Sequence, residues 1–226
     1  MAKPVQMLLQ GIGIDLIYSF VIILCSLMIY YSTKEMYELS SYKGIKYFRY
    51  AFLFFAIAYL FKSFIKFMLV YFGASRIIDL NPRFMGPLTL FIFMFFGTLA
   101  IFYLVYSLLW KKWNERSEII LGIFYLLSII ISFIIITTKQ VWVFIATSIF
   151  IFAISLFGMY LTKKQSKDKK KKNNIHTIYT LLFTFWILNM IEVLIPTQQI
   201  FQLILYLASL GVFLTILYKV VKSSGY

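Results

Sequence analysis

Two lysines lie inside an apolar stretch that is long enough to cross a lipid bilayer. Lys62 and Lys66 belong to the segment from Tyr47 to Phe72, which consists mostly of aromatic and aliphatic residues. Their spacing of four residues puts both side chains on one face of a helix. A charged group in the hydrocarbon layer is costly, so such a residue usually faces protein, water or the headgroups, and it marks a candidate functional site.

Acidic and amide residues in two other apolar stretches match these lysines in depth. Asp15 lies near the start of the first such stretch, and Glu192 lies late in another, with Asn189 one turn before it. In the helix directions predicted below, Asp15, Lys62 and Glu192 fall at a similar level in the outer half of the bilayer. Lys66 lies about 6 Å further out, at a rise of 1.5 Å per residue. Two carboxylates and two ammonium groups from three helices are therefore predicted to share one layer.

This layer has two interpretations. Ion pairs among its members would fix the packing of the helices, and the loss of one partner would leave an uncompensated charge. Alternatively, the layer forms an outward-open pocket that binds a polar or charged ligand. Lys66 alone could instead extend to the outer membrane interface. The sequence leaves these interpretations open.

Seven apolar stretches can position these residues in membrane-spanning helices. A spanning helix needs roughly 20 mostly apolar residues, and 62% of the 226 residues are hydrophobic while 13% are charged. Backbone groups in lipid must satisfy one another, and these stretches are too long for barrel strands. We therefore predict an all-α polytopic integral membrane protein, a single domain (1–226) that forms a bundle of seven transmembrane helices. The predicted spans are 7–31, 47–72, 88–110, 119–137, 141–161, 175–195 and 200–221.

Two of the predicted connections have recognisable local signals. Ser32 and Glu35 fit a capping box, which together with Gly44 predicts a short surface helix between the first two spans. The segment Gly73–Pro87 is predicted to be a loop that lies on the membrane or over the mouth of the bundle. No connection is long enough for a soluble domain.

The distribution of basic residues predicts the orientation. Of the 22 lysines and arginines, 16 flank the predicted spans on one side and 4 on the other. Basic residues accumulate on the cytoplasmic side of a membrane, so the N-terminus is predicted to be outside and the C-terminus cytoplasmic. Enrichment in Lys, Ile, Phe, Asn and Tyr is typical of an AT-rich prokaryotic genome, so we expect a multi-pass protein of a prokaryotic cell membrane.

The largest basic connection, from Lys163 to Asn174, is predicted to be a cytoplasmic loop. Each basic residue near an anionic membrane surface contributes about 1 kcal/mol of attraction, so one interpretation is contact with anionic lipids or with a cytoplasmic or membrane protein partner. The other is that the loop only sets topology. Because topology accounts for the net charge of +14, we expect no binding to nucleic acid. The residues concerned are Lys163, Lys164, Lys167, Lys169, Lys170, Lys171 and Lys172.

The sequence offers little for catalysis or for a cofactor. His176 and Cys25 are the only histidine and the only cysteine, so neither an intrachain disulfide nor a cysteine-based metal cluster can form. The HExxH, GxSxG and P-loop patterns are absent. We therefore predict no enzymatic activity, no catalytic residue, no bound metal and no cofactor. The 25 phenylalanines and 17 tyrosines are spread over every span, which indicates lipid contact and helix packing.

These features favour a sensor- or receptor-like module that binds a ligand at the outer layer. Its basic cytoplasmic loops would pass the change to a separate partner. One alternative is a small-solute transporter or channel, which requires a continuous polar path through the bundle. Another is a structural or assembly subunit of a membrane complex. The topology is similar to that of rhodopsins and receptor-type seven-helix proteins, but the last predicted span has no central lysine for retinal, and no family is assigned.

Overall fold

The described part of the chain is helical throughout its length, apart from a two-residue turn between the first two helices. The computed structural model describes residues 2–75, 82–113, 117–138, 145–146, 149–150, 153, 156, 169–194 and 199–224. Its helices are α1 (Ala2–Ser40), α2 (Lys43–Ser75), α3 (Pro82–Trp113), α4 (Ser117–Thr138), α6 (Lys169–Leu194) and α7 (Gln199–Ser224).

Five of these helices are long and apolar enough to cross a membrane. The candidate spans are Gly13–Ser40, Lys43–Ile65, Gly86–Lys111, Ser117–Thr138 and Ile200–Lys222, and α6 contains a shorter apolar stretch, Thr177–Asn189. The prediction of an all-α chain with several membrane-spanning helices is confirmed at this level.

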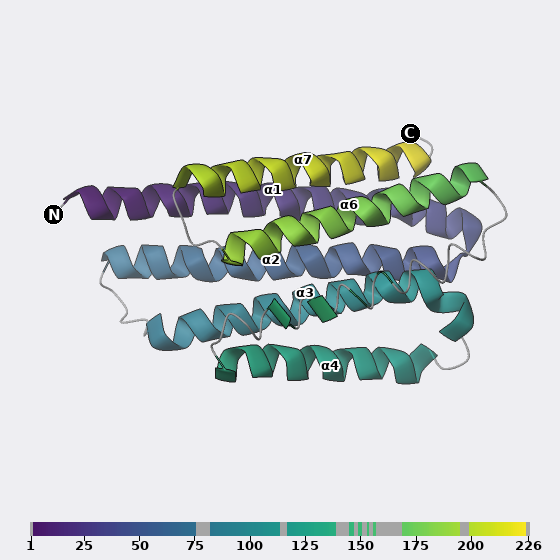
Figure 1. The fold of residues 1–226 in the computed structure, drawn as a ribbon, viewed down its shortest axis with the longest axis horizontal. Coiled ribbons are helices and arrows are strands. Elements are labelled where there is room, and N and C mark those ends of the chain that lie inside the picture. Colours follow the sequence, from purple (N-terminus) through teal and green to yellow (C-terminus); the bar gives the residue numbers. More distant parts are fainter. Residues whose placement is uncertain are drawn as a thin grey trace.

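Each of six predicted spans coincides with one described helix. The remaining predicted span, 141–161, lies outside the described residues except for a few isolated positions. The helices α4 and α6 run in the same direction in Figure 1.

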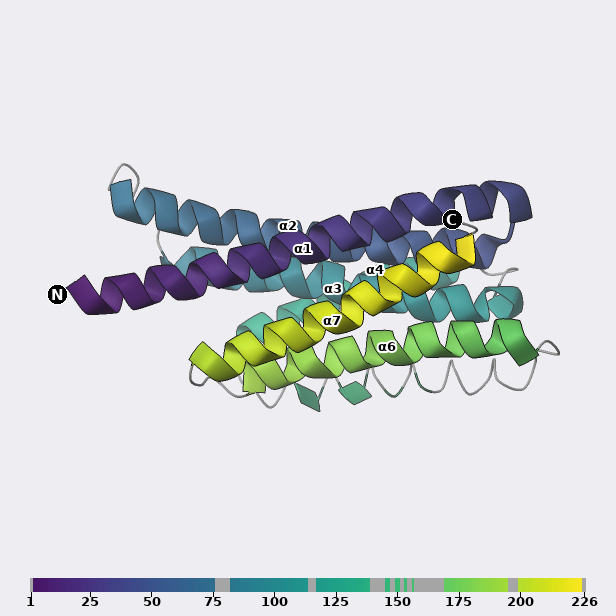
Figure 2. The same cartoon turned by 90° about the horizontal axis from the view of Figure 1, so that it is seen from above.

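The long axes of the helices follow one common direction (Figure 1). Neighbours in space are α6 with α7, α7 with α1, α1 with α2, α2 with α3, and α3 with α4. In Figure 2, α7 runs obliquely to α1. Within its apolar window α3 is 56% buried, against 28% for both α4 and α7. Of these candidate spans, α3 is thus the most buried within the described part of the chain, and α4 and α7 are the least buried.

Aromatic side chains fill much of the space between the helices. Phe52 on α2 and Phe213 on α7 are fully buried, and their ring centroids lie 6.0 Å apart. Phe185 on α6 meets Phe213 edge to face at 4.9 Å. On the other side of the bundle, Phe102 on α3 stacks on Phe124 of α4 at 4.9 Å. Lipid chains are as apolar as these rings, so close packing rather than expulsion of water holds the helices together.

The first connection differs from the prediction. Helix α1 continues to Ser40 without interruption, so the capping box and the separate surface helix were wrong. The hydroxyl of Ser32 donates to the carbonyl of Met28 within the helix, at 2.7 Å, instead of capping a new one. Lysine, glutamate, methionine and leucine, all good helix formers, fill the segment after Ser32, so the helix has no reason to stop there. It ends where Ser41 adopts a φ of 51°.

The predicted loop Gly73–Pro87 is also shorter than expected. Helix α2 extends to Ser75 and α3 already begins at Pro82. Proline suits the first position of a helix because its missing N–H would have no intrahelical partner there. Pro82 therefore suits the start of α3.

The turn between α1 and α2 packs closely against α3. A Cβ added to Gly44 would lie 2.8 Å from Cδ1 of Trp110 and 2.9 Å from the carbonyl oxygen of Ser107. The ring of Tyr42 meets Trp110 edge to face at 5.0 Å. Glycine at this position lets the start of α2 approach the backbone of α3.

Replacement of this glycine tests the packing. We expect Gly44→Ala to lower the free energy of unfolding by about 1–3 kcal/mol, because the carbonyl of Ser107 cannot move away from the added methyl group. Gly97→Ala within α3 is the matched control, since no atom lies within 4 Å of its added Cβ. Denaturation in mixed detergent micelles measures both variants. Equal stability of the two would contradict the described approach of α2 to α3.

Candidate functional site

A buried ion pair connects α1 and α2. Nζ of Lys62 lies 3.8 Å from Oδ1 of Asp15, and their side chains are 15% and 6% exposed. The ammonium group also lies over two ring faces, 5.1 Å from the centroid of Phe93 on α3 and 5.5 Å from that of Tyr59. Opposite charge and aromatic faces both stabilise a cation removed from water. The ammonium group of Lys62 is therefore in contact with one carboxylate and two aromatic rings.

The carboxylate of Asp15 is also held from α7. The hydroxyl of Tyr206 donates to Oδ1 of Asp15 at 3.0 Å. The side-chain amide of Gln202, one turn earlier on α7, donates to the Tyr206 hydroxyl at 2.9 Å. The carboxylate is thus the acceptor at the end of a directed chain of hydrogen bonds.

A second polar centre joins α6 to the same two helices. Oδ1 of Asn189 accepts from the hydroxyl of Tyr59 at 2.9 Å and from that of Tyr18 at 3.2 Å. Its Nδ2 donates to the carbonyl of Phe185 at 2.8 Å. These bonds orient the amide, with its oxygen toward the tyrosines and its nitrogen toward the α6 backbone.

Stacked tyrosines connect the two centres. Tyr18 is 1% exposed and lies parallel to Tyr206, with centroids 4.4 Å apart and an interplanar angle of 15°. It meets Tyr59 edge to face at 6.0 Å. The two centres and the stack therefore form one cluster, and Phe93 adds a contact from α3. We call it the polar layer, and its members are Asp15, Tyr18, Tyr59, Lys62, Asn189, Gln202 and Tyr206.

The structure brings three of the five predicted layer residues together. Asp15 and Lys62 form the ion pair, and Asn189 joins them through tyrosines. Lys66 lies one turn along α2 from Lys62, and Glu192 lies three residues after Asn189 on α6. The side chains of these last two residues are outside the part that the structure describes. Their place in the layer stays a prediction, as does ligand binding.

The tyrosines and Gln202 were missed by sequence reasoning. The rings of the tyrosines were attributed to lipid contact and helix packing, because tyrosines occur in every predicted span. A signal was present in the spacing, since Tyr18 follows Asp15 by three residues and Tyr59 precedes Lys62 by three. Residues three apart share a helix face. A tyrosine on the same face as an intramembrane charge is a hydrogen-bonding candidate, not only a packing residue.

The basic connection before α6 differs in part from the prediction. Helix α6 begins at Lys169, so Lys169, Lys170, Lys171 and Lys172 are helical and not part of a loop. Lysine is a good helix former, and the apolar helix behind it extends into the basic run. Lys163, Lys164 and Lys167 lie outside the described residues. Contact of these lysines with anionic lipid or with a partner stays a prediction.

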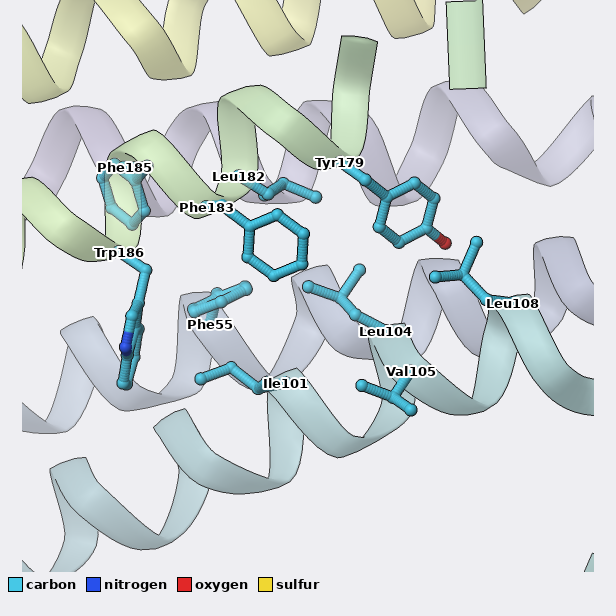
Figure 3. Close-up of a pocket in the computed structure, with 10 residues that line it drawn as sticks. All are labelled: Phe55, Ile101, Leu104, Val105, Leu108, Tyr179, Leu182, Phe183, Phe185 and Trp186. Atoms are coloured by element: carbon cyan, nitrogen blue, oxygen red, sulfur yellow. The ribbon is translucent and has the colours of Figure 1, made fainter. Parts of the chain in front are cut away.

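A small apolar cavity lies next to the polar layer, between α2, α3 and α6 (Figure 3). Its volume is about 30 Å³. At one end the hydroxyls of Ser107 and Tyr179 are hydrogen-bonded at 2.5 Å. At the other end the indole N–H of Trp186 is buried without a hydrogen-bond partner among the described residues. The described residues that line this cavity are all uncharged, and most of them are apolar.

Among the described residues, no three histidine, cysteine, aspartate or glutamate side chains lie together in a group that could hold a metal ion.

The chain is similar in sequence to an archaeal protein. The chain is 27% identical over 222 residues to a protein of the archaeon Archaeoglobus fulgidus, a match that covers 95% of this chain and 94% of the relative. That relative is described only as an uncharacterized protein. No family model matches the chain, and no solved structure matches it. The similarity therefore extends along the whole chain without indicating a function.

Removal of the Asp15 charge tests the buried pair. We expect Asp15→Asn to cost about 3–5 kcal/mol of unfolding free energy, because it removes the carboxylate charge that lies 3.8 Å from the buried ammonium group of Lys62. Asparagine still accepts from Tyr206, so the substitution isolates the charge.

The matched control is an exposed ion pair with the same distance between nitrogen and oxygen. Lys34 and Glu38 also lie 3.8 Å apart, but their side chains are 57% and 59% exposed. We expect Glu38→Gln to cost less than about 1 kcal/mol. Denaturation in mixed micelles compares the two variants, and similar losses would show that burial of the Asp15–Lys62 pair has no energetic effect.

Tyr18 and Tyr59 donate to the same oxygen of Asn189, so we expect their substitutions to have non-additive effects on the free energy of unfolding. In Tyr18→Phe or Tyr59→Phe the other hydroxyl still satisfies Oδ1 of Asn189, so each change should cost about 1 kcal/mol. The double variant leaves that oxygen without either donor, and its cost should exceed the sum of the two by at least about 0.5 kcal/mol. Strict additivity in the same assay would mean that the two tyrosines do not share the amide.

Proposed function

We propose that this chain is a non-enzymatic, sensor- or receptor-like membrane module, and that its polar layer serves both as ligand site and as a lock on helix packing. The observation that carries the proposal is the buried ion pair of Asp15 and Lys62, which is continuous with hydrogen bonds to α6 and α7. A change at this one point alters the contacts of several helices at once.

The energetics suit a lock. A buried ion pair adds little net stability because both charges lose their water, yet removing one partner costs about 3–5 kcal/mol. Reversal of a two-state equilibrium from 1:99 to 99:1 requires about 5.5 kcal/mol of differential binding. A ligand that provides new partners for both charges can therefore supply a large part of the energy that switches the packing.

The helices provide a route from the polar layer to the opposite end of the bundle. From Asp15 to Ser40, α1 runs uninterrupted for about 38 Å at 1.5 Å per residue. From Tyr206, α7 continues to Ser224 in the same direction. Both helices are rigid elements whose far ends move when their contacts in the layer change.

The charge distribution supports an orientation for this module. Lys34, Lys43, Lys111 and Lys222 lie near those ends of α1, α2, α3 and α7 that are remote from the polar layer. We propose that this end is cytoplasmic and that the polar layer is in the outer half of a prokaryotic cell membrane. Anionic lipids or a separate protein partner at the basic end would receive the signal.

A distance measurement between the far ends of α1 and α7 tests the proposal. Leu39 and Tyr218 are 90% and 62% exposed, so cysteines placed there accept spin labels in a Cys25→Ala background. We expect Lys62→Met to shift or broaden the distance distribution by several ångströms, because the ion pair with Asp15 no longer fixes the packing of the helices.

The control for this measurement is Lys34→Met, which removes only an exposed pair and should leave the distribution unchanged. An unchanged distribution in a folded Lys62→Met variant would refute the lock.

A further inference from the structure

We infer that Arg49 and Lys46, on the face of α2 that adjoins α1, bind the phosphate group of an anionic phospholipid. The inference gives the anionic lipid of the proposed function a definite site, and it rests on that proposal only for the side of the membrane. It is carried by the fixed guanidinium group of Arg49, by the N–H donors that this group has left over, and by an apolar track along α2.

The guanidinium group of Arg49 is held against α1 by two contacts with one residue. Helices α1 and α2 are neighbours that run in opposite directions (Figure 2). Nε of Arg49 donates to the carbonyl oxygen of Tyr30 at 3.1 Å. The central carbon of the guanidinium lies 4.6 Å from the centroid of the Tyr30 ring. Arginine stacks on aromatic faces, so the two contacts together present the planar group in one orientation before a ligand arrives.

Most of the donors of this guanidinium group are left over. A guanidinium has five N–H donors in a fixed fork, and only the one on Nε has an acceptor among the described residues. Arg49 is half-exposed and forms no ion pair with a described side chain. Four N–H groups therefore remain for an acceptor from outside the described part of the chain. The fork matches two oxygens of a phosphate, which an arginine can bind in a bidentate manner.

Lys46 adds a second cation on the same face of α2. It precedes Arg49 by three residues and is half-exposed. Glu35 and Glu38, the carboxylates near the end of α1, form no ion pair with either cation in the described part, and Glu38 pairs with Lys34 at 3.8 Å. Two cations that the described carboxylates do not compensate favour a headgroup with net negative charge. A zwitterionic headgroup would bring its own cation against them.

The site lies at the depth where lipid phosphates are expected. Arg49 is about 9 Å along α2 from Lys43, at 1.5 Å per residue. Its partner Tyr30 belongs to the last apolar turn of α1, before the polar segment that begins at Ser32. Tyrosine is typical of the boundary between acyl chains and headgroups, and Tyr31 is 65% exposed there. The donors of Arg49 are therefore at the level of the headgroups and not in the middle of the membrane.

An apolar track leads from Arg49 toward the middle of the bundle. Leu53 and Ile57 follow Arg49 at intervals of four residues, which puts them on the same face of α2, and both are half-buried. Leu60, three residues further along, is 51% exposed. An acyl chain can lie along these side chains while its phosphate is bound at Arg49. A soluble phosphate ester cannot use this track, so the occupant we infer is a lipid.

Native mass spectrometry of the full-length protein tests the inference. The detergent-solubilised protein is titrated with phosphatidylglycerol and, separately, with phosphatidylcholine of the same acyl chains. We expect the first phosphatidylglycerol to bind at least about tenfold tighter than the first phosphatidylcholine, because basic residues attract anionic headgroups. Glycerol phosphate should not displace it. Equal binding of the two lipids would overturn the inference, and displacement by glycerol phosphate would show a site for soluble anions instead.

A substitution that keeps the charge separates a built site from general attraction. Arg49→Lys retains the cation but loses the fork, so we expect it to weaken phosphatidylglycerol binding about tenfold. Lys222→Met is the matched control, since it removes an exposed lysine of α7 at the same end of the bundle and should bind as the wild type does. Wild-type affinity in Arg49→Lys would overturn the site.

Thermal unfolding without added lipid shows whether each variant is folded. If Arg49→Lys does not fold, Lys46→Met replaces it, with an expected loss of several-fold in affinity against no loss in Lys222→Met. Equal losses in Lys46→Met and Lys222→Met would mean that only the total charge of this end matters, which would also overturn the site.

These outcomes are independent of the polar layer. Failure of the lipid site would leave the spin-label comparison of Lys62→Met with Lys34→Met as the test of the lock. An unchanged spin-label distance in Lys62→Met would refute the lock and leave the lipid site standing.

Discussion

The cost of an ionised carboxylate inside an apolar bundle is the constraint on which the structure depends. Asp15 is 5% exposed and lies on a helix that is long and apolar enough to cross a membrane. Such a group needs an opposite charge and hydrogen-bond donors close by. Lys62 provides the charge from α2, and Tyr206 provides a donor from α7. The positions of these helices relative to α1 follow from that requirement.

The same constraint explains why tyrosines surround the pair. A tyrosine has a large apolar ring and one hydroxyl, so it packs in an apolar interior and still satisfies a polar atom. Tyr18 uses its ring against Tyr206 and its hydroxyl for Asn189. The layer therefore extends from the ion pair to α6 without a further charge among the described side chains. Phenylalanine contacts such as Phe52–Phe213 and Phe102–Phe124 add packing between other parts of the helices, and they carry no such directional demand.

The sequence predicts which segments form helices better than it predicts the residues at which those helices end. Hydrophobic stretches of sufficient length identify six of the described helices, because length and apolarity are what a membrane requires. Asp15, Lys62 and Glu192 could be predicted to lie at a similar depth, with Asn189 one turn from Glu192, since helical rise converts residue number into height. The end of α1 could not be predicted from the motif at Ser32, because a capping box competes with good helix formers on both sides. The partners of Asp15 and Asn189 on α7 and α1 depend on which helices are neighbours, and periodicity alone does not determine that.

The most direct test of this account is a double-mutant cycle on the ion pair. The free energy of unfolding is measured in mixed micelles for the wild type, Asp15→Leu, Lys62→Met and the double variant. The account predicts that each single change is strongly destabilising and that the double variant recovers much of the loss, with a coupling free energy above about 1.5 kcal/mol. Additive losses, with a coupling below about 0.3 kcal/mol, would show that the two charges do not sense each other and would contradict the lock.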